Sequence, residues 1–367
     1  MANPRLPRKE DDPTGLGPSR RRADKRVTKL MQKAARDIRE LVARLPYDIV
    51  AGESSKALKS ETRKASLVAN RDFITNYVNS YKEEIDKEWF TKEQIANEAE
   101  MLVTNRQYSW KVDGFLMDQT TRTIRQILLD ALTSGSNEWN NRWWMNAFID
   151  PSYERGTLDS FASAQLITRG IDSPSTNLIA IMEADAQLQT PAYLSRLQLV
   201  HGRVFEEMHG IVGDTVAQLR RVLTDGMGRG LGIRDISGMI NDRIGVGLSR
   251  ARTIARTETN KAYTDAYMDE SDELNKNLKD DDYSIRQMHV SALTDTTRRT
   301  HAERHGTIHT SIEQKKWWNS GSNRISCYCT VIDVLINLKT GESLQQPLID
   351  RTRARGKEFF KIHSLSV

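Results

Sequence analysis

The sequence predicts a mainly α-helical protein, in which the N-terminal two-thirds form a helical bundle or helical hairpins and the C-terminal end forms a small α+β module. Two observations support this fold class. From about Ala23 to Asp272, apolar residues recur at three- and four-residue steps, the spacing of one face of a helix. After Asp272 the pattern changes, and residues 329–338, CTVIDVLINL, form a run rich in β-branched residues that is typical of a strand.

Length and composition limit what the chain can be. Its 367 residues suffice for two or three domains, and a hydrophobic content of 38% permits a sizeable core. No window approaches the roughly 18 uninterrupted apolar residues of a membrane-spanning helix, so we expect no membrane partner. The two cysteines are separated by one residue, which argues against a disulfide framework and suits synthesis in a reducing cytoplasm.

The net charge of +5 resides in the N-terminal segment, where residues 1–30 hold nine Lys or Arg against four acidic residues. Residues 1–22 also contain four prolines and two glycines, so we expect a disordered basic arm there. Such an arm favours contact with a polyanion or an acidic partner, and the other interpretation is a solvated tail. The residues expected to contact nucleic acid are Arg20, Arg21, Arg22, Lys25 and Arg26.

Residues 23–150 are predicted to be a helical docking region. A first helix fills the start of this region, and helical patterns continue over residues 65–134. Thr91, with Gln94 three residues later, has the spacing of a helix-capping box. A tryptophan cluster near the end of the region indicates either core packing or an anchor for a protein partner. Its members are Trp139, Trp143 and Trp144.

Residues 151–175 are expected to form a connector, because this stretch is rich in residues that break helices. These are Pro151, Gly156, Gly170 and Pro174. Residues 176–272 are expected to be a second helical core, with a break at Pro191. Within it, the Gly228–Gly232 turn and a second break at Gly245 and Gly247 are predicted to separate three helices.

The last of these helices contains residues 249–263, SRARTIARTETNKAY. Small apolar residues recur on it at helical spacing, which would let another element approach closely. They include Ala251, Ala255, Ala262 and Ala266. Polar residues adjoin this stripe and form a candidate signature site, namely Arg252, Arg256, Glu258, Thr259 and Asn260. The alternative is a well-packed, alanine-rich helix with a solvated charged side.

Residues 273–340 are predicted to form the small α+β module, and residues 341–367 a basic C-terminal tail. In the module, residues 283–293 alternate like a strand, and residues 297–309 have a helical pattern.

Histidines and both cysteines concentrate in this module. His301 and His305 are one helical turn apart, and Cys327 and Cys329 fall on the same side of an extended segment. Two His and two Cys are the donors of a tetrahedral Zn²⁺ site, so one interpretation is a structural zinc site made by these four residues. The other is buried thiols beside hydrogen-bonded histidines. We expect no catalytic residues, because HAERH lacks the H-E-x-x-H order and no nucleophile motif occurs.

Five motifs occur in order within residues 211–336. They are LTDG, GIRDISGMINDRI, SRARTIARTETNKAY, the pattern D-x-x-R-x-x-H-x-x-x-x-G made by Asp295, Arg298, His301 and Gly306, and C-x-C ahead of a strand. This ordered set resembles the phage head morphogenesis family, the phage Mu F-like minor head proteins. Two departures exist, since residues 319–326 lack the family's His-Pro stretch and Tyr328 stands where the family has Arg between the cysteines.

The resemblance implies a non-enzymatic minor head protein of a tailed phage, synthesised in the bacterial host cytoplasm and located in the virion, inside the head near the portal. The expected partners are the portal protein, packaged double-stranded DNA bound without sequence specificity, and the major capsid or scaffold protein. The expected roles are head assembly, DNA packaging or DNA ejection. The alternative function is a metal-dependent or thiol hydrolase that acts on DNA or the cell wall during entry, and it would require a nucleophile or an open metal position.

Overall fold

The computed structural model describes residues 11–50, 91–96, 107–167, 184–278 and 282–363, together with residues 75, 78, 79 and 82. Helices dominate these parts, and a three-stranded antiparallel sheet lies in the C-terminal region, so the predicted fold class is confirmed. Among the helices described, none combines the length and the apolar composition needed to cross a membrane.

The chain forms two compact units, each built from segments that are distant in sequence. The sheet unit consists of residues 1–25, 141–205 and 252–367, and the helical unit consists of residues 26–140 and 206–251. Three long helices contribute residues to both units, namely α1 (Gly17–Ala43), α9 (Pro191–Gly228) and α10 (Ile233–Asn277). The sequence analysis expected domains made of consecutive residues, whereas each unit combines separate segments of the chain.

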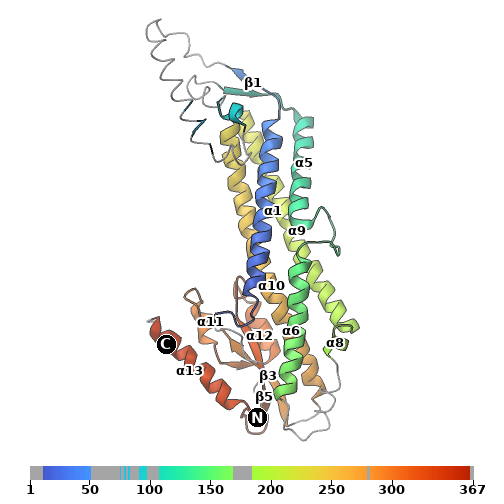
Figure 1. The fold of residues 1–367 in the computed structure, drawn as a ribbon, viewed down its shortest axis with the longest axis vertical. Coiled ribbons are helices and arrows are strands. Elements are labelled where there is room, and N and C mark those ends of the chain that lie inside the picture. Colours follow the sequence, from blue (N-terminus) through green and yellow to red (C-terminus); the bar gives the residue numbers. More distant parts are fainter. Residues whose placement is uncertain are drawn as a thin grey trace. The chain divides into compact units, whose positions relative to one another are not determined.

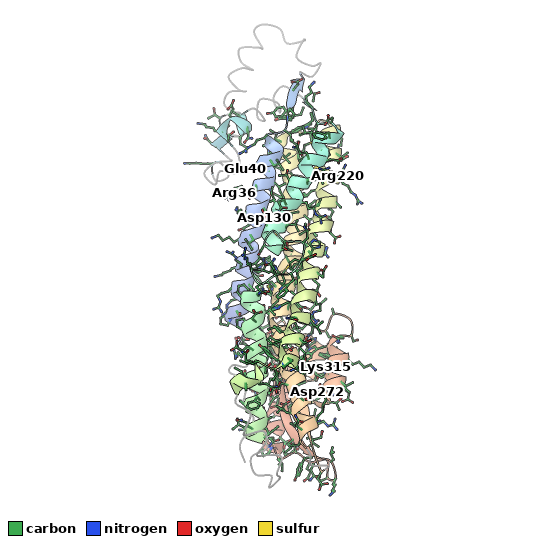
Figure 2. All side chains as sticks on the ribbon, turned by 90° about the vertical axis from the view of Figure 1, so that its right-hand side faces the viewer. Arg36, Glu40, Asp130, Arg220, Asp272 and Lys315 are labelled. Carbon is green, nitrogen blue, oxygen red and sulfur yellow. The ribbon has the colours of Figure 1, made fainter. Side chains whose placement is uncertain are left out.

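In the helical unit, α5 (Gly114–Thr133) lies beside the parts of α1, α9 and α10 that belong to this unit (Figure 1). Buried Ile and Leu residues at helical spacing form the interior, among them Ile38, Ile124, Leu128, Leu219 and Ile240. Ion pairs join the helices at the surface, where Arg220 lies 2.6 Å from Asp118 and Arg250 lies 2.6 Å from Asp214. Figure 2 labels Arg220 on this outer, polar side.

A two-stranded antiparallel ribbon also belongs to the helical unit. It pairs β1 (Tyr47–Val50) with β2 (Gln107–Trp110), and the Trp110 indole donates a hydrogen bond to the Leu231 carbonyl at 3.0 Å. The sequence did not predict it, because each strand has four residues and its partner is far away in the chain. Most of the predicted helical stretch 65–106 lies outside the described residues, but the capping box is present. Gln94 N–H donates to Thr91 Oγ1 at 3.1 Å.

The sheet unit contains the order β4-β3-β5, in which β3 (Tyr283–Val290) is central and pairs antiparallel with β4 (Ile308–His309) and β5 (Thr330–Asn337). Alternate residues of β5 point to opposite faces. Leu335 packs with residues of α6 (Asn146–Ile167) and of α10, whereas Ile332 and Val334 pack with Leu348 of α13 (Gln346–Ile362). The sheet is therefore covered on both faces.

Shorter helices complete the sheet unit. They are α8 (Ala184–Gln187), α11 (Arg299–Glu303) and α12 (Ser311–Trp318), which begins with a capping box between Thr310 and Glu313. Trp143 is buried and its ring meets that of Phe205 edge to face at 5.2 Å. The sequence allowed either core packing or an anchor for a partner, and Trp143 packs in the core.

Two sequence expectations differ from the structure because proline and glycine were interpreted as breaks. The predicted connector 151–175 is helical as far as Ile167, and α6 carries Pro151 within its first two turns. Gly245 and Gly247 do not interrupt α10, which is one continuous helix. A Cβ on Gly247 would lie 2.9 Å from Thr215 Oγ1, so this glycine permits a close helix approach rather than a turn.

The two chain ends also differ from expectation. Residues 11–22 were predicted to be disordered, but α1 already begins at Gly17, and Leu16 is buried in the core of the sheet unit. The predicted tail 341–367 contains α13, whose Phe359 and Phe360 pack on Ala302. Apolar contacts hold both segments in place. The expectations rested on the composition of the segments, which does not reveal such contacts.

Candidate functional site

The signature segment lies in the part of α10 that belongs to the sheet unit, and its small residues are fully buried. Ala255 and Ala262 are 0% exposed. The element that approaches them closely is α6, at Gly156. A Cβ on Gly156 would lie 2.2 Å from the Tyr263 carbonyl oxygen and 3.0 Å from the Ala266 Cβ, so only glycine fits there. The predicted close approach is therefore confirmed.

Asn260 joins three segments of the chain through its side-chain amide. Its Oδ1 accepts hydrogen bonds from Arg20 Nη1 at 2.8 Å and from Thr14 Oγ1 at 3.2 Å. Its Nδ2 donates to the Cys329 carbonyl at 3.2 Å. Asn260 is only 4% exposed, so all its partners are desolvated with it. The amide thus fixes the N-terminal segment and the C-x-C segment on α10.

Replacement of Asn260 by Ala should lower the free energy of unfolding by about 3 kcal/mol, because it leaves the buried Arg20 guanidinium and a buried carbonyl without their partner. Denaturant unfolding followed by circular dichroism measures this difference. The control is Asn277→Ala, at the exposed end of the same helix. Equal stability of Asn260→Ala and wild type would contradict the linking role of this amide.

The remaining signature residues form ion pairs or backbone contacts. Arg252 donates to both Asp24 oxygens, at 2.8 and 2.9 Å, and these bonds lower the pKa of the Asp24 carboxyl. Arg256 Nε lies 3.7 Å from the same carboxylate. Glu258 is buried and accepts a bond from Arg203 at 2.5 Å. Thr259 donates to the Ala255 carbonyl at 2.7 Å.

The expected nucleic-acid residues separate into two groups. Arg20 is buried, and its guanidinium contacts Asn260, Asp12 and the Tyr328 ring, which lies 4.0 Å away. It is therefore a packing residue, and its assignment as a nucleic-acid contact was wrong. The others lie exposed along α1, namely Arg21, Arg22, Lys25 and Arg26.

Three of the four residues predicted to bind zinc come together. His301 Nδ1 lies 3.4 Å from Cys329 Sγ and 3.5 Å from Cys327 Sγ. All three residues are buried, with exposures of 3, 5 and 3% for His301, Cys327 and Cys329. His301 comes from α11, and the segment ahead of β5 carries the two cysteines.

His305 does not join this cluster. The helix α11 ends at Glu303, so His301 and His305 do not share a helical face, and the His305 Nδ1 accepts the Ser291 N–H at 3.0 Å. Burial lowers the pKa of His305 to about 4. The expectation that His305 is a metal ligand was therefore wrong.

A residue that the sequence reasoning missed, His289 of β3, takes the fourth place. One donor atom each from His289, His301 and Cys329 lies within 4.8 Å of the others. Burial lowers the pKa of His289 well below its usual value, so its imidazole stays neutral. The available signal was slight: Gln287 and His289 fall on the same face of the strand, but Ser284 and Arg286 on its other face are polar too.

A second buried polar network surrounds Asp333 of β5. Its carboxyl accepts hydrogen bonds from Ser271 Oγ at 2.9 Å and from Ser160 Oγ at 3.4 Å, and Gln287 donates to Ser271 at 2.8 Å. Asp333 is 0% exposed, and this burial raises the pKa of its carboxyl from 3.8 to about 8. The carboxyl is therefore protonated at neutral pH. The available signal in the sequence was its position inside the strand-like apolar run of residues 329–338.

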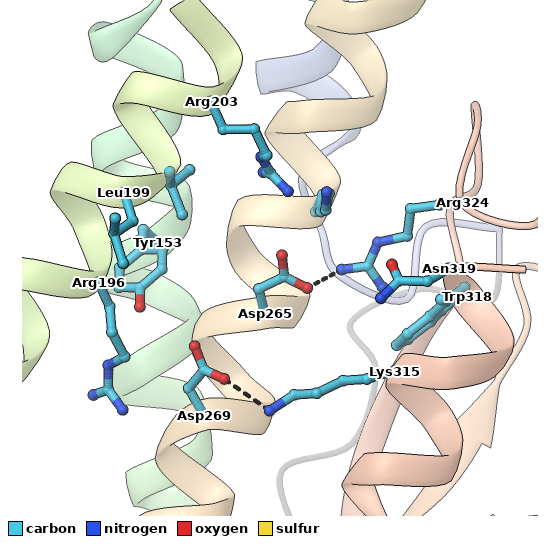
Figure 3. Close-up of a pocket in the computed structure, with 12 residues that line it drawn as sticks. Tyr153, Arg196, Leu199, Arg203, Asp265, Asp269, Lys315, Trp318, Asn319 and Arg324 are labelled. Atoms are coloured by element: carbon cyan, nitrogen blue, oxygen red, sulfur yellow. Dashed lines mark hydrogen bonds and ion pairs between the residues drawn. The ribbon is translucent and has the colours of Figure 1, made fainter.

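The sheet unit also contains a cavity of about 320 Å³ lined by α6, α9, α10 and α12 (Figure 3). Asp269 lies 2.8 Å from Lys315, and Asp265 pairs with Arg324. Each of the five cations lining the cavity has a carboxylate within 4.0 Å; they are Arg196, Arg203, Lys261, Lys315 and Arg324. Since the charges are paired locally, we assign no ligand to this cavity.

Comparison with known proteins supplies the family. Residues 217–332 match the family described as Phage Mu protein F like protein. The comparisons with curated proteins and with solved structures return no match. The matched region runs from α9 into β5 and includes Asn260, His289, His301 and both cysteines. The resemblance of the ordered motifs is therefore confirmed, since residues 217–332 are similar to the phage Mu protein F-like family.

Proposed function

We propose that the protein is a non-enzymatic minor head protein of a tailed phage, which associates with the portal inside the capsid and assists head assembly, DNA packaging or DNA ejection. The observation that carries this proposal is the family match over residues 217–332. The contacts of the signature residues support it, because Asn260 and Glu258 hold chain segments together through buried bonds. These side chains therefore serve the architecture of the sheet unit.

The alternative function, a thiol hydrolase, is less well supported. A cysteine nucleophile must reach its substrate as an accessible thiolate. Cys327 and Cys329 are 5% and 3% exposed, and both pack in the core with Trp318 and Met268. The burial of both thiols therefore favours a structural role for them.

Heads purified from an infection test the proposed function. The protein should be present in them in much smaller amounts than the major capsid protein, as measured by quantitative mass spectrometry. Heads assembled in the absence of the portal protein should lack it. Incorporation that does not depend on the portal would contradict the proposed association, and cleavage of DNA or peptidoglycan by the purified protein would favour the hydrolase instead.

The exposed basic face of α1 is the part that we propose contacts packaged DNA. Arg21, Arg22 and Lys25 fall within an arc of about 100° on the helix, since successive residues are about 100° apart. All three are exposed, and the nearest acidic residue in the chain, Asp24, faces Arg252 instead. Three cations on one helix face would attract phosphates, although the Asp12 carboxylate lies near the Arg21 guanidinium.

Neutralising Arg21 and Arg22 together, by substitution with Gln, should weaken DNA binding and reduce its salt dependence. Each lost phosphate contact lowers the slope of log K against log salt by about 0.9, so the double variant should lose about 1.8. Fluorescence anisotropy with a labelled DNA duplex at several salt concentrations measures this slope. The matched control neutralises two exposed arginines of α5, Arg122 and Arg125. Equal slopes for both double variants would contradict a DNA contact at α1.

A further inference from the structure

Four potential metal donors converge in the core of the sheet unit, and they come from three separate elements. His289 belongs to β3, His301 to α11, and Cys327 and Cys329 to the segment ahead of β5. We refer to these four residues as the His₂Cys₂ cluster. All four are at most 5% exposed. No element of the chain contributes enough donors by itself, so the fold creates the cluster.

Two distances within the cluster match the edges of a tetrahedral zinc site. Zn–S bonds of about 2.3 Å and Zn–N bonds of about 2.05 Å, at the tetrahedral angle, place sulfur and nitrogen about 3.5 Å apart. The two sulfur atoms lie 3.4 and 3.5 Å from His301 Nδ1. A donor atom of His289 lies within 4.8 Å of both His301 and Cys329 donors. A contraction around one ion would bring the His289, His301 and Cys329 donors into bonding positions, and Cys327 Sγ, which lies beside His301 Nδ1, would supply the fourth bond.

Hydrogen bonding alone does not account for this arrangement. A neutral imidazole nitrogen has one lone pair and accepts one good hydrogen bond, yet two thiols approach the same Nδ1 of His301. The His289 Nε2 is buried and has no hydrogen-bond partner. Buried polar atoms are normally paired, and one ion would satisfy both features at once.

The surroundings resemble the outer shell of a metal site. The Gln314 amide lies 2.9 Å from His289 Nδ1, where a ligand histidine usually has a partner that orients its ring. Binding through Nε2 requires Nδ1 to donate, so the Gln314 oxygen would have to turn toward His289 and give up the bond that it accepts from Arg304 Nη2 at 2.9 Å. The Trp317 ring lies 4.8 Å from His301 and 5.3 Å from His289 and excludes water from the cluster.

We propose that the His₂Cys₂ cluster binds one Zn²⁺ in a closed tetrahedral site that fastens β3, α11 and the C-x-C segment together. Four protein donors leave no open position, so the ion would be structural and not catalytic. Two sulfur and two nitrogen donors select zinc over magnesium or calcium, which prefer oxygen. This proposal does not depend on the proposed head function, since it concerns how the sheet unit is held together.

Zinc content of the full-length protein tests the proposal. Protein purified without a metal-affinity step should contain one zinc per chain, as measured by inductively coupled plasma mass spectrometry. Cys327→Ser, Cys329→Ser and His289→Ala should each reduce the content to a small fraction of this value. The matched control is His305→Ala, which removes a neighbouring buried histidine and should retain the ion. A second control is His309→Gln on β4.

Cobalt substitution keeps the test independent of whether a variant folds. Wild-type protein unfolded in chelator and refolded with Co²⁺ should show thiolate-to-cobalt charge transfer and the ligand-field bands of a tetrahedral site. Gln314→Ala should weaken zinc affinity about 10- to 100-fold, the usual effect of removing an outer-shell partner. Folded wild-type protein without stoichiometric zinc, or zinc lost in His305→Ala and retained in His289→Ala, would overturn the proposal.

Discussion

Replacing Asp333 by Asn should make the protein more stable at pH 8 and change its stability little at pH 4. Asn has one oxygen that accepts and one NH2 group that donates, so it can contact both Ser271 and Ser160 once one of the two hydroxyls turns to accept from the amide. In the wild type, burial raises the pKa of the carboxyl to about 8. In the unfolded chain, the Asp333 carboxyl has an ordinary pKa of about 3.9. As the pH rises above this value, the unfolded chain therefore gains stability relative to the folded protein.

The size and the direction of this effect follow from proton linkage. Because the pKa is raised on folding, the folded protein binds more protons than the unfolded chain between pH 4 and pH 8, and its stability falls over this window. The loss is roughly 1.4 kcal/mol per pH unit for one group, or on the order of 5 kcal/mol over the window. Asn cannot ionise, so the variant should lack this loss.

Denaturant unfolding of wild type and Asp333→Asn from pH 4 to pH 8 measures the difference. The control is Asp350→Asn, on the exposed side of α13, which should stay within about 0.5 kcal/mol of wild type across the range. A difference between Asp333→Asn and wild type that is constant with pH would mean that the carboxyl ionises as readily in the folded protein as in the unfolded chain.

Gly156→Ala should lower the free energy of unfolding by about 3 kcal/mol, at the upper end of overpacking costs. The added methyl would lie 2.2 Å from the Tyr263 carbonyl oxygen, and a backbone atom in the middle of α10 cannot move aside as a flexible side chain does. In an open helical position the same change is favourable by about 0.5–1 kcal/mol, because Ala restricts the unfolded chain. The sign of the effect therefore reports the packing distance between α6 and α10.

The matched control is Gly202→Ala, in the part of α9 that belongs to the same unit, where a Cβ would meet nothing within 4 Å. Thermal unfolding should show a lower midpoint for Gly156→Ala and an equal or higher one for Gly202→Ala. A stabilising effect at both positions would contradict the close packing at Gly156 and, with it, the role of the small residues in the signature segment.

The fold class could be predicted from the sequence because helical and strand periodicities are local properties. The strands β3 and β5 and the turn at Gly230 follow from patterns within a few residues. The continuity of α10 could not be predicted, because whether Gly247 interrupts a helix or permits close packing depends on what lies opposite it. The pairing of β1 with β2 likewise depends on a distant partner.

Only part of the candidate site could be predicted, because the rest also depends on contacts between distant residues. His301 and the two cysteines could be grouped from their composition, but the choice between His289 and His305 depends on where α11 ends and on the register of β3. Asn260 stood out through the ordered motifs, whereas its partners Arg20 and Thr14 precede it by 240 and 246 residues. Long-range contacts of this kind leave no periodic signal in one sequence.

Hydrogen exchange of the N-terminal segment tests most directly whether the signature helix holds the sheet unit together. Residues 11–24 contact Asn260 and Arg252 through buried or partly buried bonds. In wild-type protein, a peptide covering these residues should exchange as slowly as one from α6, and Asn260→Ala should accelerate exchange in residues 11–24 while α6 stays protected. Exchange of residues 11–24 at the rate of an unfolded chain in the wild type would contradict this account.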